Sequence, residues 1–88
     1  MKIIELIGPA ALYEQLAEEC AELGKAAIKM ARIIRGDNPT PVTTKEAMEA
    51  VKEEYTDVVH CALELSLVVN LDQIIRKDER WRIRISGE

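Results

Sequence analysis

The stretch that decides the fold is residues 9–35, which reads PAALYEQLAEECAELGKAAIKMARIIR. Pro9 suits the first turn of a helix, where its missing N–H costs nothing, and Gly36 is a typical helix terminator. Between them, apolar residues recur at spacings of three and four, which places them on one face of a helix: Leu12, Leu16, Cys20, Leu23, Ala27, Met30 and Ile34. The sequence therefore predicts one long helix from Pro9 to about Arg35.

A second long helix is predicted after a short loop. Residues 36–41 contain two prolines and several turn formers, which exclude regular structure. Thr43 is followed three residues later by Glu46, the pattern of a capping box that begins a helix. The three-four spacing then continues through Val51, Tyr55, Val58, Ala62, Leu65 and Val69. Because the loop is short, we expect the two long helices to form an antiparallel pair.

A third, shorter helix is predicted to start at Asn70, with Gln73 three residues on to complete a similar cap. We expect it to carry Ile74, Ile75 and Trp81 inward. Residues 81–85 alternate with period two and are compatible with a helix or an extended segment, and the form of residues 1–7 is also open. The prediction is an all-α fold in a single domain spanning residues 1–88.

The burial that this sequence requires points to an assembly of several chains. Residues 58–69 are apolar on nearly every side of the expected helix, and such a helix must be buried all round. Two long helices and a short one cannot enclose a core of that kind. We therefore expect a homodimer or homotetramer in which helices from different chains complete a bundle.

Composition excludes several classes of protein. The net charge of −4 argues against a nucleic-acid binder. The apolar-rich stretch 58–69 is too short to span a bilayer and contains His60 and Glu64, so no membrane association is expected. Cys20 and Cys61 have no CxxC spacing and the chain has one His, which does not make a usual zinc site. Free thiols and the lack of a recognisable signal peptide favour a reducing cytoplasm.

Acidic residues form the motif in this sequence that indicates a functional site. Glu18, Glu19 and Glu22 make a Glu-Glu-x-x-Glu motif in the first long helix, and Glu54 and Asp57 make Glu-x-x-Asp in the second. Residues three apart are neighbours on a helix, and both pairs border the expected seam between the helices. Like charges there repel unless a hard cation binds among them, and oxygen ligands favour Mg²⁺ or Mn²⁺. The alternative is ordinary charge on a solvated helix face.

The double motif and its surroundings resemble the MazG-like, all-α nucleoside triphosphate pyrophosphohydrolases. The resemblance covers roughly residues 13–81, including Gln15–Ala27 and Glu53–Val58. It implies hydrolysis of a nucleoside triphosphate to a monophosphate and pyrophosphate. It also implies that Mg²⁺ is bound by Glu19, Glu22, Glu54 and Asp57, with catalytic roles for Glu19 and for Glu18. Glu18 would lie just outside the direct metal ligands or help to orient the attacking water. A phosphoribosyl-ATP pyrophosphohydrolase and a non-catalytic helical dimerisation module are the alternative functions.

Substrate-binding residues are expected in the third helix, and each has a competing structural role. Lys77 and Arg80 suit contact with a triphosphate, or serve as favourable charges in the last turn of a helix. Asn70 is a candidate for a nucleotide contact, although the helix N-cap is its favoured role. Trp81 is a candidate for stacking on a base, or belongs to the core.

Overall fold

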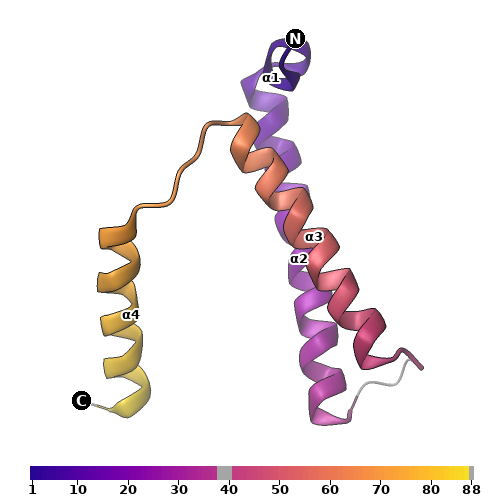
Figure 1. Ribbon diagram of the computed structural model, residues 1–88, viewed down its shortest axis with the longest axis vertical. Helices are drawn as coiled ribbons and strands as arrows, with labels where there is room; N and C mark the ends of the chain where they lie inside the picture. The colour runs from indigo at the N-terminus through magenta and orange to yellow at the C-terminus, as the bar shows by residue number, and fades with distance from the viewer. Residues whose placement is uncertain (38–40, 88) are drawn as a thin grey trace.

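The computed structural model describes residues 1–37 and 41–87, and within them every regular element is a helix. The elements are α1 (Ile3–Ile7), α2 (Pro9–Arg35), α3 (Thr44–Glu64) and α4 (Leu71–Ser86). α2 and α3 run side by side in opposite directions, and α4 stands apart (Figure 1). The predicted all-α fold and antiparallel helical pair are confirmed. Asn38, Pro39 and Thr40 of the predicted loop lie outside the described residues.

The predicted start and end of α2 and the predicted start of α3 are confirmed by local chemistry. α2 begins with Pro9 in its first turn, and Gly36 ends it in the left-handed conformation at φ 78°, which a glycine adopts without steric cost. Thr43 is the N-cap of α3, because its hydroxyl oxygen accepts a hydrogen bond from the backbone N–H of Glu46 at 3.1 Å. The same hydroxyl donates to the Glu46 carboxylate at 3.0 Å.

The seam between α2 and α3 is the core of the chain, and it is rotated by one residue from the predicted stripe. Leu12, Ala47 and Cys61 are its buried members. We call the partly or fully buried stripe of each helix the seam: Leu12, Leu16, Glu19, Leu23, Ala26, Met30 and Ile33 in α2, and Ala47, Val51, Glu54, Val58 and Cys61 in α3. The expectation that Cys20, Ala27, Ile34 and Tyr55 face the core was wrong, because Glu19, Ala26, Ile33 and Glu54 take those positions.

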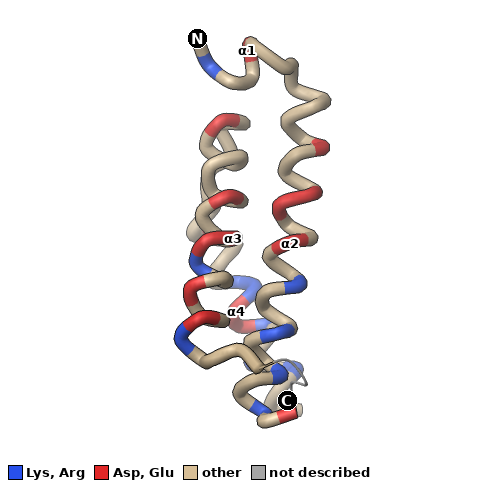
Figure 2. The backbone as a smooth tube through the Cα atoms, turned by 90° about the vertical axis from the view of Figure 1, so that its right-hand side faces the viewer, with Lys and Arg blue, Asp and Glu red and all other residues tan. Residues whose placement is uncertain are grey.

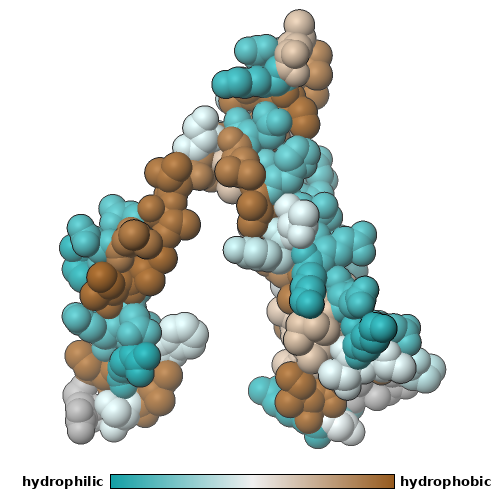
Figure 3. Space-filling model, viewed as in Figure 1, coloured by the Kyte–Doolittle hydropathy of each residue, from teal (hydrophilic) through white to brown (hydrophobic). Residues whose placement is uncertain are grey.

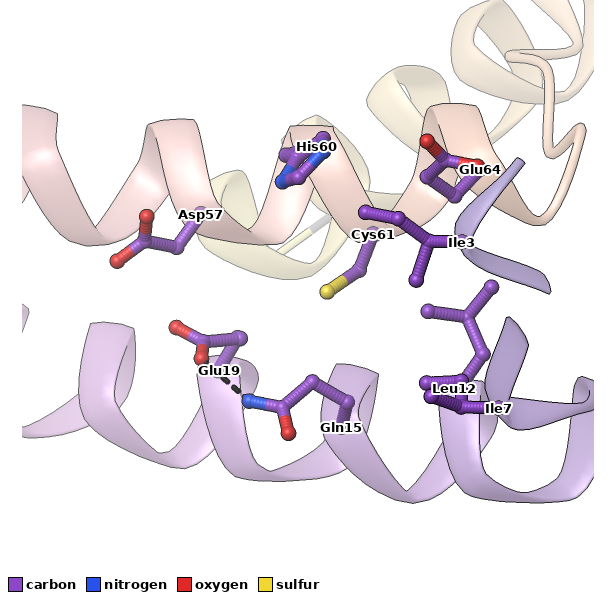
Figure 4. A pocket seen from close by; sticks show the side chains of 9 residues that line it. All are labelled: Ile3, Ile7, Leu12, Gln15, Glu19, Asp57, His60, Cys61 and Glu64. Carbon is purple, nitrogen blue, oxygen red and sulfur yellow. Dashed lines mark hydrogen bonds between the residues drawn. The ribbon is translucent and has the colours of Figure 1, made fainter. Parts of the chain in front are cut away.

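α3 ends at Glu64, so the prediction that the second helix continues to Val69 was wrong. The N–H of Leu67 bonds to the carbonyl of Ala62 at 2.9 Å, and Ser66 adopts a left-handed φ of 57°, which closes the helix. Cys61 lies opposite Leu12, the first seam residue of α2 (Figure 4), so the seam stops there. Further helix would have no partner in this chain.

α4 has a regular cap at each end and includes residues 81–85. These residues are therefore helical and not extended. Asn70 is its N-cap, as predicted: the Asn70 Oδ1 accepts from the backbone N–H of Gln73 at 3.0 Å. α4 makes no substantial contact with the hairpin. Ile74, Ile75 and Trp81 are therefore exposed, Trp81 by 64%, and the expectation that they point inward does not hold within one chain.

α1, whose form the sequence left open, packs against the start of α2. No helix in the described residues is long and apolar enough to cross a membrane.

Apolar side chains (brown) gather along the segment before α4 and on α4 itself (Figure 3). Among them are Leu67, Val68 and Leu71, and Val68 is 90% exposed.

The chain as a whole is far more open than a compact domain of its size. Its radius of gyration is 16.6 Å, whereas a compact chain of this length has about 12 Å. It exposes 7223 Å², whereas a folded monomer of 9.9 kDa exposes about 5,200 Å². Roughly 2,000 Å² of surface is therefore in excess of what a compact monomer leaves open.

The N-cap role of Asn70 is testable by hydrogen exchange of the α4 amides. Replacing the cap by Ala costs about 1 kcal/mol, so we expect Asn70→Ala to speed exchange across the first turns of α4 about fivefold. Asn70→Asp keeps a carboxylate oxygen for the Gln73 N–H and is expected to leave exchange nearly unchanged. Equal acceleration in both variants would contradict the capping role.

Candidate metal centre

Three carboxylates from two helices converge in the middle of the hairpin. Glu19 comes from α2, and Glu54 and Asp57 come from α3. Each offers an oxygen, and these oxygens all lie within 4.8 Å of one another. Two ligands on opposite sides of one Mg²⁺ lie about 4 Å apart, since each Mg–O distance is near 2.1 Å. Small side-chain rotations therefore suffice for the three oxygens to share one ion of that size.

The position of these groups within the helices is unusual for acidic residues. Glu19 occupies the seam between Leu16 and Leu23, and Glu54 occupies it between Val51 and Val58. An apolar side chain at these places would complete an unbroken seam in each helix. All three carboxylates are half-buried. Taking charged groups out of water is costly unless they are paired, so their presence at the seam favours a ligand-binding role over ordinary surface charge.

No basic side chain among the described residues forms an ion pair with these three carboxylates. In residues 1–37 and 41–87 the only ion pair joins Arg82 to Asp78 within α4. Burial raises the pKa of the Glu54 carboxyl, and repulsion from Asp57, Glu22 and Glu19 raises it further. A divalent cation would reverse this balance, because it stabilises the ionised form of every carboxylate around it.

Gln15 orients one of the carboxylates. Its Nε2 donates a hydrogen bond of 2.7 Å to the Glu19 Oε1, one turn along α2 (Figure 4). The bond leaves the other oxygen of Glu19 available on the side of Asp57. Sequence analysis did not assign Gln15 a role, although its spacing of four residues from Glu19 is the signal that would have suggested one.

A cavity of about 160 Å³ opens beside the carboxylates. It lies where α1 meets the hairpin, and it shares Glu19 and Asp57 with the carboxylate cluster (Figure 4). The rest of its lining is apolar toward α1 and polar at its rim: Ile3, Ile7, Leu12 and Cys61, with Gln15, His60 and Glu64. Burial, with a smaller effect from the nearby Glu19 and Asp57 charges, raises the pKa of the Cys61 thiol and favours its neutral form.

The other predicted site residues do not belong to the group of three converging carboxylates. Glu22 lies outside the three-carboxylate group, although its charge acts on Glu54, and Glu18 is exposed on α2. Acidic residues occupy the first half of α2 and basic residues its second half (Figure 2). The four predicted substrate-binding residues all belong to α4 or its cap, away from the carboxylates of the same chain: Asn70, Lys77, Arg80 and Trp81.

One structural alternative for α4 was wrong. Lys77 and Arg80 were candidates for stabilising charges in the last turn of a helix, but α4 continues to Ser86 and Arg84 is the basic residue of its last turn. Lys77 and Arg80 therefore lie in the middle of an exposed helix.

Comparison with known proteins does not assign the chain to a family. No protein-family model, curated protein or solved structure matches it significantly. The residues and their geometry are therefore the basis for any functional proposal.

Because the pKa of Glu54 is raised, we expect its replacement by an uncharged glutamine to stabilise the fold by an amount that depends on pH. Below its ordinary pKa of 4.5 the carboxyl is protonated and resembles an amide, so Glu54→Gln and the wild type are expected to melt alike. As pH rises from 4.5 to the raised pKa of the folded state, the unfolded chain ionises Glu54 more readily than the folded chain does, so the stability of the wild type falls over this range. In metal-free buffer near neutral pH we expect the variant to melt a few degrees higher, measured by circular dichroism.

Glu49→Gln is the matched control, because Glu49 is an exposed glutamate of the same helix. Its melting difference from the wild type is expected to stay constant with pH. A Glu54→Gln difference that is already present below pH 4.5, or that never appears, would show that Glu54 is not repelled at the seam.

Proposed function

We propose that this chain is a Mg²⁺-dependent hydrolase that converts a nucleoside triphosphate to a monophosphate and pyrophosphate. The observation that carries the proposal is the convergence of Glu19, Glu54 and Asp57 at the seam, within reach of one ion and with no basic partner in the part of the chain that the structure describes. The second support is the resemblance of the Glu-Glu-x-x-Glu and Glu-x-x-Asp motifs to the MazG-like pyrophosphohydrolases.

The donor set fits magnesium and the chemistry of phosphate. It consists of oxygens only, which favour Mg²⁺ or Mn²⁺ over the metals that prefer nitrogen or sulfur. Magnesium retains several waters and binds through a few carboxylates together with phosphate oxygens of a substrate. Glu19, Glu54 and Asp57 would hold the ion, with Glu22 as a fourth ligand. Bound there, it would neutralise triphosphate charge and acidify water.

The side chains of the hairpin supply the remaining steps. The reaction adds one water across the bridge between the α and β phosphates, with hydroxide joining the α phosphorus and the proton leaving with pyrophosphate. Gln15 holds Glu19 in place through the 2.7 Å hydrogen bond. Glu18 is exposed one residue before Glu19 and is free of the three-carboxylate group. We assign it the orientation of the attacking water, and a proton-accepting role falls to a carboxylate not committed to the ion.

The surroundings of the site complete the proposal. The cavity beside Glu19 and Asp57 is apolar on one side and polar at its rim, which suits the nucleoside part of a substrate. Lys77 and Arg80 stand apart from the carboxylates of their own chain, so contact with the triphosphate would come from another copy. The same holds for Asn70 and Trp81. A homodimer or homotetramer is thus part of the proposal, as is a cytoplasmic location, which suits the exposed free thiol of Cys20.

Pyrophosphate release from a panel of nucleoside triphosphates in Mg²⁺ tests the reaction. We expect turnover of at least one nucleotide by the wild type, and a loss of about 100-fold or more in Glu19→Gln and in Asp57→Asn, because each removes a charged ligand. Glu14→Gln, an exposed glutamate on α2, serves as the control and should retain full activity.

The same panel separates the alternatives. Turnover of phosphoribosyl-ATP alone would identify the alternative substrate with the site intact. Equal, negligible turnover by the wild type and all variants would favour a non-catalytic dimerisation module and reject the hydrolase.

Metal binding is tested independently by thermal stability. At a Mg²⁺ or Mn²⁺ concentration ten times the dissociation constant, the folded state gains about 1.4 kcal/mol, which raises the melting temperature by several degrees. We expect this shift in the wild type and in Glu14→Gln, and its disappearance in Glu54→Gln, at constant protein concentration. A shift of the same size in Glu54→Gln would place the bound ion elsewhere.

A further inference from the structure

The cavity beside the candidate metal centre has two chemically different ends. Its metal end holds Glu19 and Asp57, and its other end lies against α1, where Ile3 and Ile7 form an apolar wall (Figure 4). Glu64 of α3 lies at the rim of this α1 end, beside Ile3 (Figure 4). The proposed function uses the metal end, and it leaves the Glu64 carboxylate without a role.

Glu64 is poorly placed for the stability of its own helix. It is the last residue of α3, where the helix dipole is negative and an acidic side chain is unfavourable. It is half-buried, and it forms no ion pair within residues 1–37 and 41–87. A charge in such a position loses water without gaining a partner, so the fold alone does not account for it. Its place in the lining of a cavity favours a ligand as the partner.

The volume of the cavity limits what it can hold. It measures about 160 Å³, whereas pockets that enclose a whole drug-sized ligand measure roughly 300 Å³ or more. There is room for one flat ring system but not for a triphosphate as well. A nucleoside triphosphate bound here would therefore keep its phosphates outside, at the metal end, and lay its base against the apolar wall of α1.

The length of α3 between the two ends matches the length of a nucleotide. Asp57 and Glu64 are seven residues apart, which corresponds to a rise of about 10 Å along the helix. Residues at that spacing share nearly the same side of a helix. With its α phosphate at the ion, an extended nucleotide reaches about that far with the outer edge of its base, whereas its sugar hydroxyls lie closer to the phosphate. Glu64 is therefore positioned for the base and not for the sugar.

A carboxylate at that position selects a base by its hydrogen-bond donors. An ionised glutamate accepts hydrogen bonds and donates none, and its two oxygens suit two parallel N–H groups. Guanine presents such a pair on one edge, the N1–H and the 2-amino group. Adenine and cytosine place a ring acceptor beside their amino group, and uracil places its N–H between two carbonyl oxygens. The donor pattern of guanine is thus the one that matches Glu64.

We propose that Glu64 recognises the base of the substrate and that this base is guanine, held by hydrogen bonds from its N1–H and its 2-amino group. The inference rests on the proposed function, of which it names the substrate class. The triphosphate lies at Glu19, Glu54 and Asp57, and the base lies between the apolar wall of α1 and the last turn of α3.

Binding of nucleosides tests the base without a phosphate, a metal or turnover. Guanosine has both donors, inosine lacks the 2-amino group, and adenosine has a ring acceptor in place of the N1–H. Chemical shifts of the Ile3 and Ile7 methyl groups report binding, because both side chains line the cavity. We expect the wild type to bind guanosine at least about tenfold more tightly than inosine, and adenosine more weakly still.

Glu64→Gln is the variant that tests the residue. Its amide offers one acceptor and one N–H donor, so it cannot accept both hydrogen bonds of guanine. We expect the variant to bind guanosine and inosine about equally, with the helicity of the wild type. Glu49→Gln is the matched control, because Glu49 is exposed on the same helix, and it should keep the preference for guanosine.

The outcomes separate the base site from the proposed reaction. Equal binding of the three nucleosides, or no binding of any, would overturn the assignment even if a triphosphate is hydrolysed. A preference for guanosine that survives in Glu64→Gln would place base recognition on another residue and overturn it as well. A preference lost in Glu64→Gln would support the base site, and in a chain that releases no pyrophosphate it would do so while the hydrolase is rejected.

Discussion

The arrangement of this protein depends on the cost of placing negative charge in a thin apolar seam. Two helices in contact bury few side chains, and among the described residues Leu12, Ala47 and Cys61 form the buried core. Glu19 and Glu54 occupy two of the remaining seam positions, which gives up apolar contact in the middle of the only core that the described chain possesses. Charged residues at positions that packing alone would fill with apolar side chains are typical of functional sites.

The same seam carboxylates explain the raised pKa of Glu54 and the proposed binding of a cation. Asp57 adds a third carboxylate one turn from Glu54, and the pKa of Glu54 rises because the group is partly desolvated among like charges. A protein can relieve this by protonation or by a cation. At neutral pH a hard divalent ion relieves it more completely, because it offsets several charges at once. The hydrogen bond from Gln15 then helps to fix the direction of the ligands rather than their charge.

Helix existence and caps were predictable from sequence because they depend on local chemistry. Pro9, Gly36, Thr43 and Asn70 act within a few residues of themselves, and the structure places each as expected. The orientation of the helices was not predictable in the same way. Alanine and cysteine pack equally well on either side of the seam, so spacing alone did not distinguish Cys20 from Glu19 as the inward residue.

The end of α3 and the position of α4 depend on tertiary contacts that no local pattern contains. Residues 65–69 are apolar enough to continue a helix, and their helix stops where α2 no longer offers a partner. The convergence of Glu19, Glu54 and Asp57 was predictable because residues at three-residue spacing on neighbouring helices can meet at their contact, whereas Glu22, predicted with them, lies outside the group. Gln15 and the cavity were not predictable, because they depend on the relative position of α1 and the two long helices.

The isolation of α4 has a consequence for how folding and assembly are related. A helix of this length is marginal in water without tertiary contacts, and α4 has almost none within its own chain. Its order must then come largely from whatever covers its apolar side. In the proposed oligomer, separation of the subunits would also unwind α4, so that association and secondary structure would be gained and lost together.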